Sequence, residues 1–512
     1  MNKNVSIRLK RVITRNLLLV VIGIIGLLFS GNIGLHMIAS AATQSEREKN
    51  DSYATANTIA LGNSVTGTIS SYDDVDYYKL VHASNGKIEL VFCHTYVDSG
   101  AAWSVCTYIY ENGEYTQLSN WSVSLNGGEK EAIPYIGVVK NGVYYIKVAR
   151  NYGSVEGENY TIQTRFTSSN YFEKEENDVY SSATDMEVNQ SYNGILNSSL
   201  DKDYYKIVAS QNGKIELSFC HTYVDSGAAW SVCTYIYENG EYTQLSNWSV
   251  SLNDGEKESI PYIGVAKNGV YYIKVARNYG SVEGENYTIQ TKFTSSNYFE
   301  RERNDVYASA TDMNLNKAYN GTINSSADKD YYKIVAPETG MISLKFVHPY
   351  KDTSGGWNVS MYRYEDGQYI KLFGESIYLN SNITSSLPFI GVAKKGIYYV
   401  KVEKSYGTIE GENYTINGKF SANAPVSINA SVNKNKVTLT WSKVNDVTGY
   451  EIYYRKGKQG IYKKLTSTVK TKYTYKKLKK GTMYYFKVRA YKVSGNSNFY
   501  SAYTNVKSVK YK

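Results

Sequence analysis

Oxygen-bearing side chains gather in two clusters, and both clusters recur three times along the chain. The first alternates acidic residues and ends in Asn-Asp, at residues 46–51, 173–178 and 300–305. The second reads Asp-x-Asp-Tyr-Tyr and follows each copy of the first. Alternate side chains of an extended segment point to the same face. Each cluster is therefore predicted to present several carboxylate or amide oxygens on one side.

If the two clusters of one copy meet, their oxygens suit a hard cation. Calcium takes roughly 6–8 oxygen ligands in flexible geometry, and the clusters contain no His or Cys, the ligands typical of zinc and copper. The alternative is a solvated acidic linker before each domain. The predicted calcium ligands are Glu46, Glu48, Asn50, Asp51, Asp74, Asp76, Glu173, Glu175, Asn177, Asp178, Asp201, Asp203, Glu300, Glu302, Asn304, Asp305, Asp328 and Asp330.

The clusters belong to a longer repeat. Trp103, Trp230 and Trp357 stand 127 residues apart, as do the second Asp residues of the three Asp-x-Asp clusters. Residues 85–126 and 212–253 differ only where Val91 is replaced by Ser218. A fixed period predicts equivalent structural units. We expect three domains, at residues 43–169, 170–296 and 297–423, called repeats 1, 2 and 3 below.

Each repeat has the pattern of a β-protein. Residues 87–92, 143–148 and 160–164 of repeat 1 are rich in branched and aromatic residues, which is typical of strands. Asn112-Gly113 and Asn141-Gly142 are hairpin signals. Several short strands with regular turns predict an all-β, jelly-roll-like sandwich.

Together these motifs resemble a known family. The Glu-x-Glu-x-Asn-Asp opening, the Asp-x-Asp-Tyr-Tyr-Lys cluster and the strand Gly-Val-Tyr-Tyr-Ile-Lys-Val resemble the bacterial pre-peptidase C-terminal domain, which includes the collagen-binding domains of clostridial collagenases. The resemblance implies a jelly-roll sandwich that binds calcium through the two acidic clusters. The sequence departs from the collagen-binding pattern, because Ala149 and Asn151 stand where those relatives carry aromatic residues.

Repeats 1 and 2 each contain two cysteines, Cys93 with Cys106 and Cys220 with Cys233, and repeat 3 lacks both. Joint absence is what a bonded pair predicts, and export would permit disulfides. Disulfides are therefore expected, with two free thiols per repeat as the alternative. Trp121 and Trp248 are also absent from repeat 3. If exposed, they would give the first two repeats a shared ligand face.

Residues 424–512 form a different module. Residues 436–441, 449–455 and 478–484 resemble a fibronectin type III domain, an immunoglobulin-like sandwich. The resemblance implies that Trp441 is the buried tryptophan of an early strand and that Tyr484 is the corner tyrosine.

Charge and the amino terminus predict the cellular setting. Basic residues, the apolar run 17–29 and Ala39-Ser40-Ala41 fit a signal peptide at residues 1–42, so no membrane span is expected after cleavage. Of the net charge of +10, residues 424–512 carry +18 and the first 42 residues carry +5, which leaves −13 for residues 43–423. A module with this much positive charge is expected to bind a polyanion. Nucleic acid is not the expected partner of an exported protein.

The sequence carries no His-Glu-x-x-His zinc motif, Gly-x-Ser-x-Gly elbow or phosphate-binding loop, so no enzyme is predicted. The predicted function is a secreted, calcium-binding protein, retained at the cell envelope, that binds an extracellular polymer: a wall glycan, teichoic acid or host matrix protein. The alternatives are an accessory protein for a separate secreted hydrolase and an unrecognised secreted hydrolase.

Overall fold

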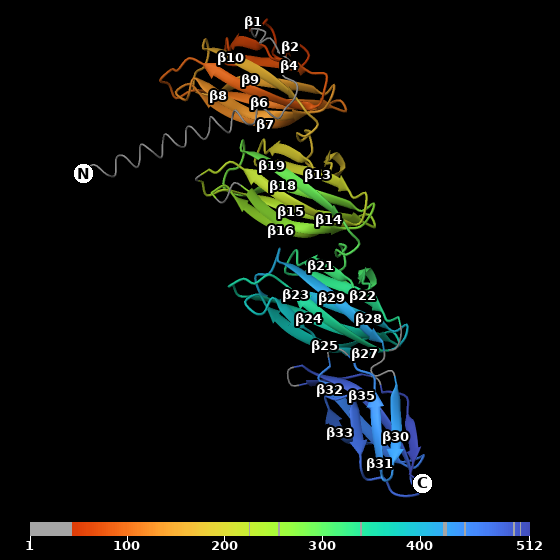
Figure 1. The fold of residues 1–512 in the computed structure, drawn as a ribbon. Helices are drawn as coiled ribbons and strands as arrows, with labels where there is room; N and C mark the ends of the chain where they lie inside the picture. Colours follow the sequence, from red (N-terminus) through yellow and green to blue (C-terminus); the bar gives the residue numbers. More distant parts are fainter. Residues whose placement is uncertain are drawn as a thin grey trace, which may run out of the picture. The chain divides into compact units, whose positions relative to one another are not determined.

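The computed structural model describes residues 43–224, 226–253, 257–337, 340–422, 427–444, 447–494, 497–501 and 503–511. The predicted signal peptide, residues 1–42, lies outside these ranges. The described chain is built almost entirely of strands (Figure 1), which confirms the predicted all-β fold class. Within these ranges, no helix has the length and apolar character needed to cross a lipid bilayer.

Repeat 1 packs two sheets face to face. One has the strand order β3-β10-β5-β8 and the other the order β2-β4-β9-β6-β7. The strands of this repeat are β1 (Thr43–Ser45), β2 (Asn57–Ala60), β3 (Ser64–Thr68), β4 (Val75–Val81), β5 (Gly86–His94), β6 (Ala102–Glu111), β7 (Glu114–Ser124), β8 (Lys130–Val138), β9 (Val143–Tyr152) and β10 (Asn159–Ser168).

Repeat 2 has the same arrangement. Its sheets have the orders β12-β19-β14-β17 and β11-β13-β18-β15-β16. Its elements are the 3-10 helix η1 (Tyr180–Ser182) and the strands β11 (Thr184–Asp185), β12 (Ser191–Ile195), β13 (Lys202–Val208), β14 (Gly213–His221), β15 (Ala229–Glu238), β16 (Glu241–Ser251), β17 (Lys257–Val265), β18 (Val270–Tyr279) and β19 (Asn286–Ser295).

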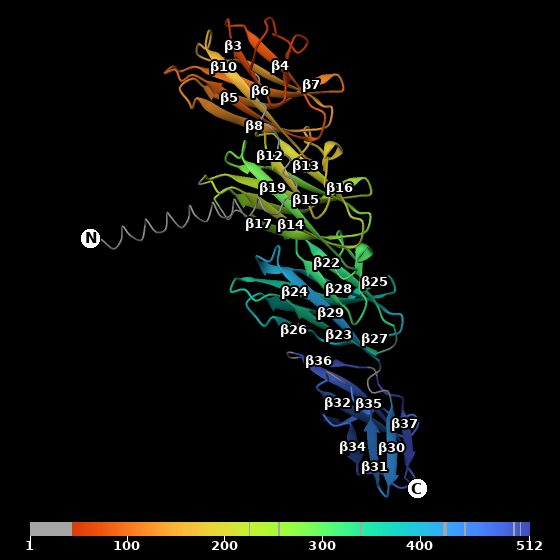
Figure 2. The same ribbon diagram turned by 45° about the horizontal axis from the view of Figure 1, so that its top comes forward.

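Repeat 3 follows the pattern with one change, which Figure 2 shows from a second direction. The strand equivalent to β17 is split into β26 and β27, and both parts pair with β23. Its elements are η2 (Tyr307–Ser309), β20 (Thr311–Asp312), β21 (Ala318–Thr322), β22 (Lys329–Val335), β23 (Gly340–Val347), β24 (Gly355–Glu365), β25 (Gln368–Tyr378), β26 (Thr384–Ser386), β27 (Ile390–Val392), β28 (Ile397–Gly407) and β29 (Asn413–Ala422).

The core of each repeat lies between its two sheets. Alternate residues of β5 are buried and partly exposed, as expected for a strand with one face on a core. Phe92 of β5 packs against Trp103 of the opposite sheet, with ring centroids 5.3 Å apart. The strands predicted at residues 87–92, 143–148 and 160–164 fall within β5, β9 and β10 and are confirmed.

The two predicted hairpins have different outcomes. Asn112 and Gly113 have positive φ angles of 52° and 89°, and they join β6 to its partner β7 as predicted. Asn141 also has a positive φ, 62°, but the strands on either side of it, β8 and β9, belong to different sheets. The hairpin prediction at Asn141-Gly142 is therefore wrong, because this tight turn crosses from one sheet to the other.

The predicted disulfides are also wrong, because Cys93, Cys106, Cys220 and Cys233 are all free. Cys93 lies on β5 and Cys106 on β6, in different sheets. Both alternate with core residues, so each faces away from the core. The full thickness of the sandwich separates them, and packed sheets lie about 10 Å apart, too far for a disulfide.

The terminal module is a second kind of sandwich. One sheet has the order β30-β31-β34 and the other the order β33-β32-β35-β36, with β37 also paired to β35. Trp441 is buried, and the Tyr484 hydroxyl accepts a hydrogen bond from the Lys479 amide (3.0 Å), as the resemblance implied for both. The strands are β30 (Ile428–Asn433), β31 (Lys436–Trp441), β32 (Gly449–Lys456), β33 (Lys463–Thr468), β34 (Lys472–Tyr475), β35 (Met483–Ser494), β36 (Ser497–Tyr500) and β37 (Lys507–Lys510).

Candidate metal centres

The opening segment of each repeat is hydrogen-bonded to both sheets. In repeat 2, the Glu173 amide donates to the Asn193 carbonyl of β12 (3.0 Å), and the Tyr204 amide of β13 donates to the Asn177 carbonyl (3.1 Å). Since β12 and β13 belong to different sheets, the segment bridges one edge of the sandwich. The second acidic cluster lies at the start of β13. The fold therefore brings the two clusters of the repeat together, and equivalent bonds do so in repeats 1 and 3.

In repeat 2, Glu175, Asp201 and Asp203 place carboxylate oxygens within 4.8 Å of one another. All three side chains are buried. One oxygen of Asp203 accepts from the Tyr287 hydroxyl (2.5 Å), and one oxygen of Asp201 accepts from the Asn197 amide (2.5 Å). The second oxygen of each aspartate has no hydrogen-bond partner among the described residues. Burying such atoms is costly, so the cluster has the character of a binding site.

Repeat 3 brings together Glu300, Glu302 and Asp330, again within 4.8 Å and buried. One oxygen of Glu300 accepts from the Thr322 amide (2.8 Å), and one oxygen of Asp330 accepts from the Tyr414 hydroxyl (2.6 Å). The remaining oxygen of each has no partner in the described part of the chain.

Repeat 1 has two overlapping groups that share Glu48. Glu48 lies within 4.8 Å of Glu46 and Asp76 in one group, and of Asp51 and Asp74 in the other. All five carboxylates predicted for this repeat therefore converge. Unlike its equivalents in repeats 2 and 3, this site is open, because Glu48 and Asp51 are exposed.

The remaining predicted ligands lie beside these groups. The side-chain oxygens of Asn50, Asn177 and Asn304 are buried and have no partner among the described residues. Four carboxylates lie outside the groups of three and accept backbone hydrogen bonds: Glu173 from the Ile195 amide (3.0 and 3.1 Å), Asp178 from Lys202 (2.9 Å), Asp305 from Lys329 (3.2 Å) and Asp328 from Asn324 (2.6 Å).

Burial and like charge disfavour ionisation of these carboxyl groups. Burial is the main cause that raises the pKa of Asp76 to about 8, of Asp201 to about 7 and of Glu302 to about 8, and neighbouring carboxylates add to it. A nearby positive charge favours the ionised form. A cation among these groups would therefore lower their pKa values toward the ordinary range.

Two asparagines belong to the sites although the sequence analysis missed them. The Asn197 amide group donates to Glu175 (2.7 Å) and that of Asn324 to Glu302 (2.9 Å). Each side-chain oxygen is buried without a partner in the described ranges. The available signal was an Asn-Ser-Ser string before the second cluster in repeats 2 and 3, but Ser70 replaces the asparagine in repeat 1.

A pair of buried tyrosines supports each site and was also missed. The two hydroxyls of each pair are hydrogen-bonded to each other, and the second tyrosine donates to an aspartate of the site, which fixes the orientation of that carboxylate. The pairs are Tyr78 with Tyr160 (2.7 Å), Tyr205 with Tyr287 (2.9 Å) and Tyr332 with Tyr414 (2.8 Å). Their hydroxyls come from strands of opposite sheets, which sequence spacing alone does not reveal.

The donor set fits calcium. Every candidate ligand atom is a carboxylate or amide oxygen, and no histidine or cysteine of the described residues joins the groups. Hard oxygen ligands with several negative charges are what calcium selects. The residues that could hold it in repeat 2 are Glu175, Asp201 and Asp203, with the amide oxygens of Asn177 and Asn197 beside them.

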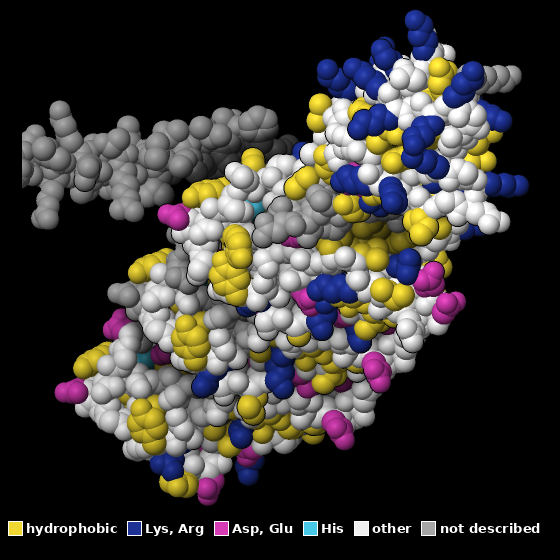
Figure 3. Space-filling model, turned by 90° about the horizontal axis from the view of Figure 1, so that it is seen from below, with side chains coloured by type: hydrophobic (Ala, Val, Ile, Leu, Met, Phe, Trp, Pro, Cys, Tyr) yellow, Lys and Arg dark blue, Asp and Glu magenta, His cyan; other side chains and the backbone are white. Residues whose placement is uncertain are grey.

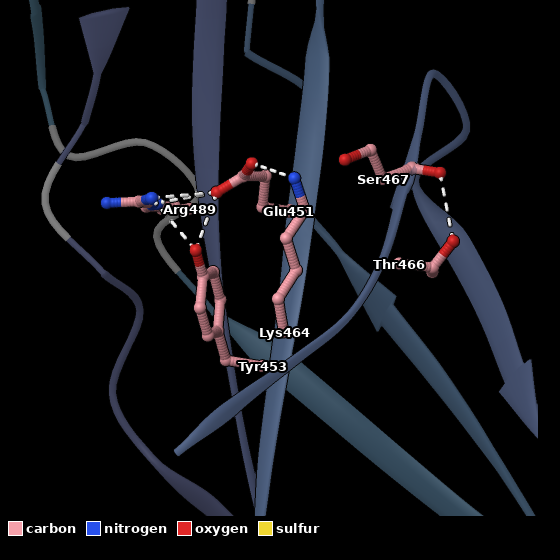
Figure 4. Close-up of polar contacts among 6 residues, drawn as sticks. All are labelled: Glu451, Tyr453, Lys464, Thr466, Ser467 and Arg489. Carbon is pink, nitrogen blue, oxygen red and sulfur yellow. Dashed lines mark hydrogen bonds and ion pairs between the residues drawn. The ribbon is translucent and has the colours of Figure 1, made fainter. Parts of the chain in front are cut away.

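The terminal module has a different charged centre, around Glu451 of β32. This buried carboxylate accepts hydrogen bonds from Lys464, from Arg489 (2.8 and 3.0 Å) and from the Tyr453 hydroxyl (2.8 Å), as Figure 4 shows. Burial opposes its ionisation, but the bonds from Lys464 and Arg489 outweigh burial and lower the pKa of Glu451. A single acid is thus shared between two bases.

Next to this centre, lysine and arginine side chains lie over tyrosine rings. Lys487 lies over Tyr503, 3.6 Å from the ring centroid, and Arg455 lies 4.8 Å from the centroid of Tyr485. Burial, Arg489 and Arg455 lower the pKa of Lys487, so this face has surplus positive charge. Figure 3 shows Lys and Arg side chains crowded on the terminal module. We call Arg455, Lys487 and Arg489 with their tyrosines the cationic face.

Comparison with known proteins finds two partial matches. A chain of an alpha-amylase from Niallia circulans is 28% identical over 184 residues, which are 33% of this chain and 13% of that protein. The chain thus spans only 13% of that relative's length. The pre-peptidase C-terminal domain of collagenase from Bacillus anthracis is a structural neighbour at 19% identity and a TM-score of 0.17, covering 22% of this chain and 94% of the domain.

Two further matches involve the fibronectin type III domain. A fibronectin-type-III-like protein from Clostridium thermocellum is similar at 26% identity and a TM-score of 0.14, covering 16% of this chain and 86% of that protein. The family model of the fibronectin type III domain matches residues 423–507. The basic sandwich that ends this chain is therefore a fibronectin type III domain.

Proposed function

We propose that the protein is a secreted, non-catalytic binding protein in which three tandem pre-peptidase C-terminal-like repeats each bind calcium. The observation that carries this proposal is the recurrence of buried, unpaired carboxylate and amide oxygens at the meeting point of the two acidic clusters. Calcium would neutralise the clusters and fix the opening segment of each repeat to both sheets.

Isothermal titration of the full chain with calcium tests this proposal. Extracellular calcium sites often bind at about 10⁻⁴–10⁻³ M, so the titration must reach millimolar calcium. We expect heat of binding that shrinks in stages as Asp76→Ala, Asp203→Ala and Asp330→Ala are combined. Asp312→Ala, at the exposed position of β20, is the matched control and should bind like the unaltered chain. Equal loss in the control, or no binding at all, would contradict the proposal.

We further propose that the cationic face binds an anionic extracellular polymer, with wall teichoic acid as the first candidate. Three features support it: surplus positive charge, planar side chains that stack beneath the bases, and the charge of +18 on residues 424–512. Phosphate or carboxylate groups along a polymer would meet fixed positive charges there. Retention of the secreted protein at the cell envelope follows from this partner.

A binding assay on immobilised wall teichoic acid tests the partner. The full chain with Arg455→Ala and Lys487→Ala should bind at least tenfold more weakly. Lys434→Ala with Lys436→Ala removes the same charge at exposed positions of the β30–β31 turn and should change binding less than threefold. Binding should be lost in about 1 M salt, where screening shortens the range of charge attraction to about 3 Å. Equal loss in both variants would show that only net charge matters.

A second candidate function is that of an accessory protein for a separate hydrolase. The partial similarity to an alpha-amylase favours it, because a stretch that is 13% of that protein has the size of a shared accessory module. Adding the chain to a polysaccharide hydrolase should then speed hydrolysis of an insoluble polymer but not of a soluble one. Hydrolysis of casein, collagen or wall polysaccharide by the purified chain alone would instead make it an enzyme.

A further inference from the structure

The candidate calcium site of repeat 2 is closed by a strand of repeat 1. The Glu175 amide of repeat 2 donates to the Gly137 carbonyl of β8 in repeat 1 (3.1 Å). A Cβ atom on Gly137 would lie 2.3 Å from the Glu173 carbonyl oxygen, closer than a Cβ can approach. Glycine therefore permits the contact between the two backbones, next to two predicted ligands.

The same strand places a buried tyrosine against the opening segment of repeat 2. Tyr135 of β8 is 6% exposed, and its hydroxyl has no hydrogen-bond partner in the described part of the chain. Burial raises its pKa well above the ordinary value, and the charges of Glu173 and Asp203 in the next repeat raise it further. The Tyr135 ring also contacts Phe172 of repeat 2, which precedes the predicted ligand Glu173, with ring centroids 5.9 Å apart.

The junction between repeats 2 and 3 is built in the same way. The Glu302 amide donates to the Gly264 carbonyl of β17 (3.0 Å), and a Cβ atom on Gly264 would lie 2.4 Å from the Glu300 carbonyl oxygen. The Tyr262 hydroxyl is buried without a partner among the described residues, and burial, with Glu300 as the largest charge, raises its pKa.

The equivalent positions of repeat 3 differ, because a type III domain follows it. Phe389 replaces the tyrosine there and packs in one apolar cluster with Ile428 and Trp441 of that domain. Gly391, the equivalent of Gly137 and Gly264, is exposed. The hydroxyl is therefore present only where an acidic cluster comes next.

The tryptophans that repeat 3 lacks follow the same rule. A Cβ atom on Gly284 of repeat 2 would lie 3.1 Å from Trp121 of repeat 1, and one on Gly411 would lie 3.6 Å from Trp248. Each tryptophan thus lies against the following repeat and is only partly exposed, so the exposure required for a shared ligand face is not met. Repeat 3, which is followed by a different domain, has Glu375 at this position.

We propose that repeats 1 and 2 complete the cation sites of repeats 2 and 3, so that calcium binding and docking of neighbouring repeats are one linked equilibrium. This inference rests on the proposed calcium function. Because coupling between two binding events is reciprocal, calcium strengthens the junction as much as the junction strengthens calcium binding. Repeat 1 follows residues 1–42 rather than another repeat, and its open site binds calcium independently.

Hydrogen–deuterium exchange of the full chain during a calcium titration tests the coupling, because peptides covering residues 46–51, 173–178 and 300–305 report each site separately. Gly137→Val separates repeats 1 and 2 without altering a ligand side chain. We expect it to raise the calcium midpoint of the 173–178 peptide at least tenfold and to leave the 46–51 peptide unchanged. Gly391→Val, at the exposed equivalent, is the matched control and should shift no midpoint.

Tyr135→Phe is the milder variant and removes only the hydroxyl. It should raise the midpoint of the 173–178 peptide about threefold, and exchange in calcium-free buffer will show whether either variant remains folded. If calcium protects all three peptides but Gly137→Val and Tyr135→Phe leave the 173–178 midpoint within experimental error, the coupling is wrong and the calcium sites stand. If calcium protects none of the peptides in the unaltered chain, the calcium function is wrong and the coupling falls with it.

Discussion

Replacing Asp330 by asparagine should change the stability of repeat 3 in opposite directions with and without calcium. Without calcium, the fully buried Asp330 has a pKa of about 6 instead of 3.8. At about 1.4 kcal/mol per pKa unit, ionising it at pH 8 costs about 3 kcal/mol of folding free energy. Asparagine removes that charge and keeps an oxygen for the Tyr414 hydroxyl. Its amide group gains no partner, which costs about 1–2 kcal/mol. The variant should therefore be more stable by about 1–2 kcal/mol.

With calcium the order reverses. Calcium at a hundred times its dissociation constant adds about 2.7 kcal/mol to a site that binds only in the folded state. The variant lacks one of the charged ligands, so it should gain little of this. The unaltered repeat then becomes the more stable of the two by about 1 kcal/mol.

The change in melting temperature is clearest by calorimetry if all three repeats are altered together, as Asp76→Asn, Asp203→Asn and Asp330→Asn. In a chelator at pH 8 the melting temperature should rise by about 3–8 °C, and added calcium should raise it only in the unaltered chain. Asp312→Asn, exposed on β20, should have no effect in either condition. A variant that melts lower in chelator, or that keeps its full calcium stabilisation, would refute the reasoning.

Three further outcomes are expected. In chelator, the free energy of unfolding should fall as the pH rises from about 5 to about 8. The folded state still holds protons at Asp330, Asp201 and Asp76, whose pKa values are about 6, 7 and 8, whereas the unfolded state has already released them. Urea titrations at each pH measure this fall, and saturating calcium should remove it. Trp357→Ala should cost about 3–5 kcal/mol, since this tryptophan is fully buried, whereas Tyr350→Ala, at an exposed position, should cost less than about 0.5 kcal/mol. Alkylation of the denatured chain without a reducing agent should modify all four cysteines, as measured by mass spectrometry. Cysteines that stay unmodified in pairs would indicate disulfides and contradict the structure.

The strand pattern of the repeats could be predicted from the sequence because each strand carries a local signal. The branched and aromatic residues of β5 and β9, and the positive φ angles required at Asn112-Gly113, depend on neighbours in the chain. The turn at Asn141-Gly142 has the same local signal, yet its two strands separate into different sheets. Which sheet a strand joins is decided by packing across the sandwich, and no dipeptide encodes it.

The acidic clusters could be predicted because every copy repeats them. Asn197 and Asn324 escaped because repeat 1 has Ser70 at that position. The disulfide prediction failed for a related reason. Repeat 3 lacks the equivalents of both Cys220 and Cys233, which shows that the two positions vary together. The two side chains nevertheless lie on opposite sides of the sandwich. Cys233 packs with Tyr235 and Tyr272 on the outer face, and nothing in the structure explains why it varies together with Cys220.

The Phe389 position separates two kinds of building block. A unit that carries Tyr135 or Tyr262 and the matching tryptophan has the contacts needed to be followed by another copy of itself. Repeat 3, with Phe389 and Glu375, is an adaptor that stops the series and accepts a foreign domain. Extra units can therefore be inserted ahead of the adaptor with the existing junction residues, so the length of this protein is adjustable in steps of 127 residues while the type III domain that follows the adaptor stays the same.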